Sequence, residues 1–89
     1  MTRVTDNESE SRFELHLNGD LAGWIDYRRS GDVVALTHAE VLPELRNRGL
    51  GEQMVRDALA DLEQRGLRPQ AVCPFVRAYV RRHPESVRA

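Results

Sequence analysis

Two arginines and two glycines lie together in the middle of the chain and could bind an anion. The segment from Arg46 to Gly51 reads RNRGLG, follows an apolar stretch and opens onto an amphipathic helical pattern. Glycine lets the backbone approach a ligand closely, and a helix start presents unpaired N–H groups and the positive end of its dipole. Such a turn suits a phosphate or pyrophosphate. The alternative is a tight strand-to-helix turn with solvated arginines, and the segment has neither a Walker lysine nor a third dinucleotide-binding glycine.

Three other side chains could act as a base or a nucleophile. His38 and Glu40 lie two residues apart in a predicted strand, so both point to one face of the sheet. The imidazole is the better base near neutral pH, but a structural histidine and a glutamate paired with an arginine are equally consistent with the pattern. Cys73 directly precedes a predicted helix, where a thiol gains nucleophilic character. The alternative for Cys73 is a small buried hydrophobic residue.

The hydrophobic pattern predicts the elements that would position these residues. Apolar and polar residues alternate over 12–17 and resume over 21–29, with Asn18-Gly19-Asp20 as the turn of a hairpin. Residues 33–42 are apolar on both faces except for His38 and Glu40, which indicates a central strand.

The second half of the chain predicts helix, strand and helix. Residues 50–65 carry apolar side chains at helical spacing and are followed by Gly66, a natural helix stop. Residues 68–73 predict a short strand parallel to 33–42, because a helical crossover between them is right-handed. Pro74 begins a last helix that ends at His83-Pro84, with Phe75 and Tyr79 on one face.

The order β-β-β-α-β-α predicts an α/β fold of the α+β type, built on a single mixed sheet. Residues 1–11 are polar and acidic without periodicity, so we expect a disordered leader there and a single domain over residues 12–89.

The composition and net charge of the chain argue against several classes of function. The net charge is −1 and all 13 basic residues are arginine, so no basic field for nucleic acid and no lysine nucleophile is available. One cysteine excludes an intrachain disulfide, and three widely spaced histidines show no metal-ligand spacing. No apolar run could span a bilayer and no signal-peptide pattern is visible. We therefore expect a cytoplasmic protein without membrane, nucleic-acid or metal partners.

The motif Arg46-x-x-Gly49-x-Gly51, placed between a strand and a helix, resembles the acetyl-CoA-binding motif of the GCN5-related N-acetyltransferases. Residues 36–41 (LTHAEV) and 73–85 (CPFVRAYVRRHPE) are similar to a short subfamily with a minimal acetyltransferase-like domain. The resemblance covers residues 12–86. It departs at Ala39, where threonine is common, and at Ser86, where we expect tyrosine.

The resemblance implies a minimal fold of this superfamily that transfers acetyl from acetyl-CoA to an amine. The cofactor arm would lie between two splayed parallel strands, 33–42 and 68–73. Acetyl-CoA would be held by a set of residues around the loop and the last helix: Val41, Arg46, Arg48, Gly49, Leu50, Gly51, Glu52 and Arg82.

Catalysis would fall to His38 and Cys73, with weaker candidacies for Glu40 and Tyr79. Cys73 could act through a transient acetyl-cysteine, and Tyr79 could protonate the leaving thiolate or simply pack with Phe75 on the sheet.

The acceptor and the activity itself stay open at this stage. The acceptor could be a small amine or a protein amine, because the helices that usually wall the acceptor side are missing. The alternative function is a CoA-binding module with weak or no catalysis that acts as a sensor or partner protein. An RNA-binding module is disfavoured by the neutral charge and by the lack of an aromatic recognition motif. We expect a monomer or weak homodimer.

Overall fold

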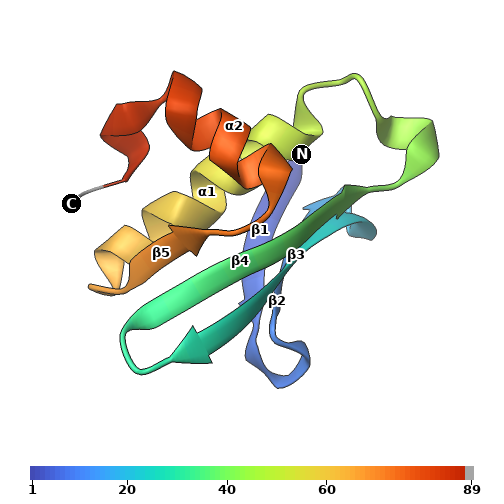
Figure 1. The fold of residues 1–89 in the computed structure, drawn as a ribbon. Helices are drawn as coiled ribbons and strands as arrows, with labels where there is room; N and C mark the ends of the chain where they lie inside the picture. Colours follow the sequence, from blue (N-terminus) through green and yellow to red (C-terminus); the bar gives the residue numbers. More distant parts are fainter. Residues whose placement is uncertain (88–89) are drawn as a thin grey trace.

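In a computed structural model, which describes residues 1–87, five strands form one mixed sheet with two helices over one of its faces (Figure 1). The strands lie in chain order and pair antiparallel, except that the last two are parallel. This confirms the predicted single mixed sheet. The elements are β1 (Thr2–Asn7), β2 (Arg12–Leu17), β3 (Asp20–Ser30), β4 (Val33–Val41), α1 (Leu50–Gln64), β5 (Arg68–Ala71) and α2 (Pro74–Arg82), with 3₁₀ turns at Glu8–Glu10, Pro43–Leu45 and Pro84–Ser86.

The leader expected over residues 1–11 is instead part of the sheet. Strand β1 pairs with β2 along its whole length, from Thr2 opposite Leu17 to Asn7 opposite Arg12. The expectation failed because the strand is held by distant contacts that a local pattern does not reveal. Arg65 at the end of α1 donates to Asp6 over 2.8 Å, and Tyr27 of β3 donates to the same carboxylate over 2.6 Å. The domain therefore begins before residue 12, and residues 88–89 lie outside the described part of the chain.

A single hydrophobic core fills the space between the sheet and the helices. Alternate residues of β2, β3 and β4 face the helices, as the period of two requires. Burying these side chains is the main stabilising contribution to so small a domain. Its fully buried larger members are Phe13, Leu15, Ile25, Val34, Leu36, Met54, Val55, Leu59, Leu62 and Val76.

The opposite face of the sheet carries polar residues and has no helix over it (Figure 1). Near the end of β4, Trp24 lies opposite Glu40 and Asp26 lies opposite His38. The register between β3 and β4 shifts after Asp26, and Thr37 is the extra residue on β4. This bulge turns His38 and Glu40 to the open face and leaves Ala39 and Val41 toward the helices.

Strand β5 stays beside β4 for only four residues. The pairing runs from Val33 opposite Arg68 to Leu36 opposite Ala71. Both Val72 and Cys73 then donate their N–H groups to the Leu36 carbonyl, over 3.1 and 2.9 Å. The chain turns into α2 at this point, two residues before the predicted end of the strand, while β4 continues to Val41. The two parallel strands therefore splay apart, as the resemblance implied.

Candidate functional site

A hollow of about 420 Å³ lies where β4, the loop after it and the first turns of α1 and α2 meet. Because β5 leaves at Leu36, the last part of β4 is one wall of this hollow. The first turn of α1 is the second wall, and Phe75 of α2 is the third. The lining residues are Ala39, Glu40, Val41, Leu45, Arg46, Asn47, Gly49, Leu50, Gly51, Glu52, Met54 and Phe75.

The start of α1 offers hydrogen-bond donors to this hollow. Gly49 has φ +76°, a left-handed conformation that favours glycine, and no side chain caps the helix. The first helical hydrogen bond in α1 is from Gln53 N–H to the Gly49 carbonyl, at 3.1 Å. The N–H groups of Leu50, Gly51 and Glu52 are therefore without a helical acceptor. Three free donors at the positive end of a helix dipole are suited to an anion.

Gly51 has a different purpose from Gly49. Its φ is not positive, so the helix does not require glycine there. A Cβ at this position would come within 2.9 Å of Phe75 Cζ and 3.6 Å of Val41 Cγ2. The absent side chain therefore leaves room for the Phe75 ring, which is 40% exposed although it is large and apolar. Sequence reasoning placed Phe75 with Tyr79 on the sheet; instead, Phe75 lines the hollow.

The free edge of β4 faces the gap left by β5. Leu42 donates its N–H to the Ala22 carbonyl beside β3, over 2.9 Å. Backbone groups alternate sides along a strand, so the N–H and carbonyl of Val41 point away from β3 and into the gap. The Val41 carbonyl accepts a hydrogen bond from Arg46 Nε at 3.1 Å.

Glu40 connects Arg46 to His38. One carboxylate oxygen accepts from Arg46 Nη2 at 2.8 Å, and the other lies 2.9 Å from His38 Nε2. The hydrogen bond from His38, followed by that from Arg46, lowers the pKa of Glu40. A carboxylate only accepts, so Nε2 of a neutral His38 carries the proton and Nδ1 is the basic nitrogen. His38 and Glu40 thus share a face as predicted, and their shared partner is an arginine of the loop.

Of the four catalytic candidates, Glu40 lines this hollow, His38 lies beside it on the open face, and Cys73 and Tyr79 lie in the core. Cys73 is 5% exposed and sits at the point where β5 turns into α2. Tyr79 is 6% exposed and lies beside the His83 ring, with ring centroids 4.5 Å apart. Burial raises the pKa of Tyr79, which makes it a weaker acid than a solvated tyrosine. Tyr79 lines a second hollow, of about 630 Å³, between α1 and α2.

The outer arginines lie around the start of α1. Arg82 of α2 donates to Glu52 in the first turn of α1 over 3.2 Å, so two predicted cofactor residues meet across 30 positions of sequence. Arg48 is exposed beside Gly49 and makes no hydrogen bond or ion pair with the rest of residues 1–87. The structure therefore gathers Val41, Arg46 and residues 49–52 at one hollow, with Arg48 and Arg82 at its margin.

The described residues provide neither a metal cluster nor a membrane-spanning helix. Residues 1–87 contain no cluster of three or more histidine, cysteine or acidic side chains that could hold a metal ion. Neither helix in this part of the chain has the length and apolar character needed to cross a membrane.

Comparison with known proteins places this site in a family. The model of the GCN5-related N-acetyltransferase family matches residues 12–89. Comparison with curated protein sequences gives no significant match.

Solved structures share the fold at low sequence identity. A GCN5-like protein from Staphylococcus aureus is 17% identical with a TM-score of 0.70, over 94% of this chain and 82% of that one. A family acetyltransferase from Brucella melitensis in complex with acetyl-CoA is 23% identical with a TM-score of 0.63, over 80% of this chain. AAC(6')-Iy in complex with a bisubstrate analogue of CoA is 22% identical with a TM-score of 0.53, over 84% of this chain. The present chain spans 49% and 58% of the latter two.

Proposed function

Because the chain belongs to the GCN5-related N-acetyltransferase family, we propose that it binds acetyl-CoA and transfers the acetyl group to an amine. The observation that carries this proposal is the gap between β4 and β5, which opens after Leu36. Beyond it, the last residues of β4 line the same hollow as the start of α1 with its free N–H groups. One side of the gap offers an anion site and the other a free strand edge. The narrower assignment to the short minimal subfamily remains a prediction.

The donor set suits a pyrophosphate. Three backbone N–H groups at the start of α1 and the side chain of Arg46 line the same hollow, and Arg48 adds positive charge at its margin. Guanidinium groups bind phosphate oxygens in pairs, and backbone donors are fixed in place before the ligand arrives. Phe75 supplies an apolar wall against which the uncharged pantetheine arm can pack.

Acetyl-CoA supplies an activated acetyl thioester. The Val41 N–H, which points into the gap, is placed to donate to the oxygen on which negative charge develops. His38 Nδ1, left free when Nε2 bonds Glu40, can remove a proton from the incoming amine.

Cys73 and Tyr79 are proposed to act from the inner end of the gap. Cys73 is the residue at which β5 departs from β4, and Tyr79 follows it on α2. Both are buried, so a direct role requires the start of α2 to move when the arm enters.

The acceptor amine is proposed to approach from the helix-free face, where His38 and Glu40 lie. Residues 1–89 contain no lysine, so a lysine acceptor would lie outside these residues. A small amine and a protein amine both fit a face without walls. We place this activity in the cytoplasm, in a monomer or weak homodimer.

Thermal unfolding with increasing CoA tests the binding step. A melting temperature that rises with CoA concentration is expected, since a ligand bound only to the native state stabilises it. A melting temperature unchanged at millimolar CoA would rule the proposal out.

Release of free thiol from acetyl-CoA with a panel of amines tests the chemistry. His38→Ala and Cys73→Ala are compared with the unaltered chain, and we expect His38→Ala to lower turnover at neutral pH. Binding without thiol release from any amine would instead indicate the alternative function, a CoA-binding sensor or partner module.

A further inference from the structure

The carboxylate of Glu40 lies between a residue of the cofactor loop and the proposed base. Its Oε2 accepts from Arg46 Nη2 at 2.8 Å and its Oε1 lies 2.9 Å from His38 Nε2. Arg46 also holds the Val41 carbonyl through Nε. The Arg46 guanidinium therefore contacts both the free edge of β4, at the Val41 carbonyl, and Glu40, the carboxylate that partners His38.

We propose that Glu40 is a positioning residue that links the anion site to the base His38. When an anion binds beside Arg46, Arg46 leaves Glu40, and the carboxylate then makes His38 a stronger base. This inference rests on the proposed function, because the anion in question is the pyrophosphate of the cofactor. It assigns to Arg46 a second effect besides binding, and to Glu40 a role that does not involve contact with substrate.

The Arg46–Glu40 contact is suited to exchange. The two side chains are 54% and 32% exposed, and ion pairs this open to water contribute little to stability. A pyrophosphate carries more charge than a carboxylate and can accept two parallel bonds from a guanidinium, whereas Glu40 accepts only one from Arg46, through Oε2. The free N–H groups of α1 hold that anion next to Arg46, so the arginine can change partners at small cost.

The exchange changes the environment of His38. While Arg46 is bound, its positive charge offsets the carboxylate of Glu40. Once Arg46 turns to the anion, the whole charge of the carboxylate acts on His38, and a nearby negative charge favours the protonated imidazole. Nδ1 then accepts a proton from the amine more readily, only when the cofactor is present. The Val41 carbonyl is freed in the same movement.

The other groups around His38 do not provide this link. Asp26 of β3 lies directly opposite His38, and within residues 1–87 its carboxylate makes no hydrogen bond or ion pair with the imidazole or with Arg46. Trp24, opposite Glu40, is uncharged, and its ring lies 5.5 Å from the guanidinium carbon of Arg12. Among the charged neighbours within residues 1–87, Glu40 is the one that contacts both His38 and the loop.

Nitrogen-15 spectra of the histidine rings test the link in the full chain. In the free protein, we expect His38 to carry its proton on Nε2, and CoA to shift the ring resonances of His38. The rings of His16 and His83, which lie on β2 and after α2, serve as internal controls. Melting temperatures measured on the same samples report CoA binding separately.

Arg46→Gln and Arg48→Gln form a matched pair, because each removes one charge from the loop and only Arg46 contacts Glu40. Arg46→Gln should move the His38 resonances in the free protein toward their CoA-bound positions and abolish the further response to CoA. Arg48→Gln should weaken CoA binding but keep the response of His38. Glu40→Gln should abolish the Nε2 signature and shift the acid limb of the kcat/KM profile more than it changes KM for acetyl-CoA.

Either of two results would overturn the inference. One is a free Arg46→Gln protein whose His38 resonances match those of the unaltered chain and of Arg48→Gln; this comparison needs no cofactor. The other is a CoA-dependent rise in melting temperature without any response at His38, which would leave the proposed function intact.

Discussion

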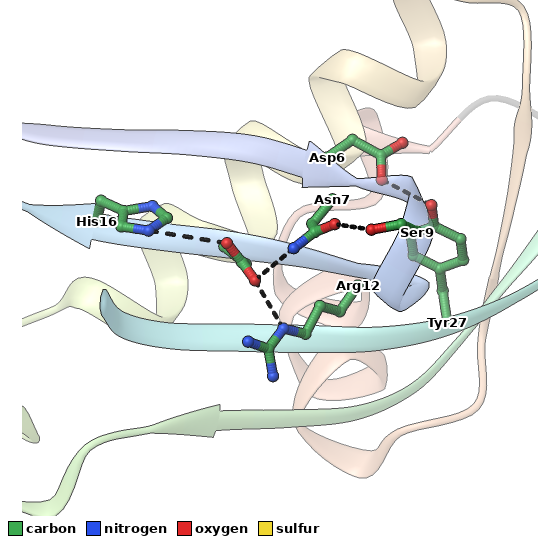
Figure 2. A network of polar contacts seen from close by, with 7 residues as sticks. Asp6, Asn7, Ser9, Arg12, His16 and Tyr27 are labelled. Carbon is green, nitrogen blue, oxygen red and sulfur yellow. Dashed lines mark hydrogen bonds and ion pairs between the residues drawn. The ribbon is translucent and has the colours of Figure 1, made fainter. Parts of the chain in front are cut away.

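The sheet carries two sets of arginine, glutamate and histidine, and their surroundings differ. On β2, Glu14 accepts from Arg12 at 2.8 Å and from Asn7 of β1 at 3.0 Å, and lies 3.7 Å from His16 (Figure 2). On β4, Glu40 contacts Arg46 and His38 at similar distances. The side chain of Glu14 is 12% exposed and that of Glu40 is 32% exposed.

The comparison shows that residue types alone do not mark a site. Glu14 lies inside the sheet between two paired strands, and its partners on β1 and β2 complete its hydrogen bonds. Glu40 lies on a strand whose other edge is free, and its arginine belongs to a loop that lines a hollow. The first set joins β1 to the domain, while the second can exchange partners with a ligand.

The largest expected change in the free energy of unfolding comes from Asp6 on β1. Asp6 accepts from Tyr27 Oη and Arg65 Nη2, and its side chain is 12% exposed. We expect Asp6→Ala to lower the free energy of unfolding by about 3 kcal/mol, because two hydrogen-bonding groups lose a half-buried charged acceptor. Urea unfolding measures this. Asp57→Ala, which removes an exposed partner 3.4 Å from Arg56, is the control and should cost at most about 0.5 kcal/mol. Equal effects would contradict the role of Asp6.

The two glutamates provide the direct test of the comparison. Glu14→Gln should lower the free energy of unfolding by about 1–2 kcal/mol, because the charge-assisted bonds from Asn7 and Arg12 are partly buried. Glu40→Gln should change it much less, because the Arg46–Glu40 pair is open to water. Urea unfolding of both variants measures the two changes. A larger loss of stability for Glu40→Gln than for Glu14→Gln would show that Glu40 and its partners have a structural role.

Gly51→Ala should separate binding from stability. Alanine favours a helix by about 1 kcal/mol over glycine, and this gain is offset by displacement of the Phe75 ring, so stability should change by less than about 1 kcal/mol. The affinity for CoA, measured by calorimetry, should fall about tenfold, equivalent to about 1.4 kcal/mol, as the ring enters the hollow. Gly66→Ala is the control: at φ +71° it should destabilise the protein and leave affinity unchanged. Gly51→Ala with full affinity would contradict the contact assigned to Phe75.

The smallest expected effect is that of Glu14 on the free energy of unfolding at acid pH. The hydrogen bond from Asn7, then that from Arg12, lowers the pKa of Glu14. A lowered pKa in the native state means that the stabilisation is present above the ordinary glutamate value of about 4.3 and is lost as the pH falls through the native value. As the pH falls from about 4.3 through the lower native value, the free energy of unfolding should therefore fall more steeply for the unaltered chain than for Glu14→Gln. Parallel curves in acid urea titrations would refute this assignment.

Periodicity in the sequence was enough to predict most of the fold. The strand expected at 33–42 is β4 at Val33–Val41, and the helix expected at 50–65 is α1 at Leu50–Gln64, because both carry strong local patterns. Strand β1 was missed because its evidence is distant: Asp6 meets Arg65 across 59 positions. The composition of the polar segment 1–11 does not reveal this contact with Arg65.

The candidate site was predictable to a similar degree. The loop from Arg46 to Gly51 could be recognised from its residues and its place between strand and helix. The exposure of Phe75 could not, because helical spacing places it beside Tyr79 and its contact, Gly51, is on another element. The sequence left undecided whether Glu40 pairs with an arginine and with which one. The path of the loop brings Arg46 to it.

The short edge strand β5 has a consequence for association between chains. Arg68 and Val72 donate their N–H groups toward β4, so residues 69 and 71 face outward. Residue 69 is proline, which has no N–H, and Ala71 is the one remaining outward donor of this strand. A foreign strand laid along this edge therefore finds a single N–H donor, that of Ala71, in place of a row of donors. The edge that opens the cleft is thereby also protected against amyloid-like growth.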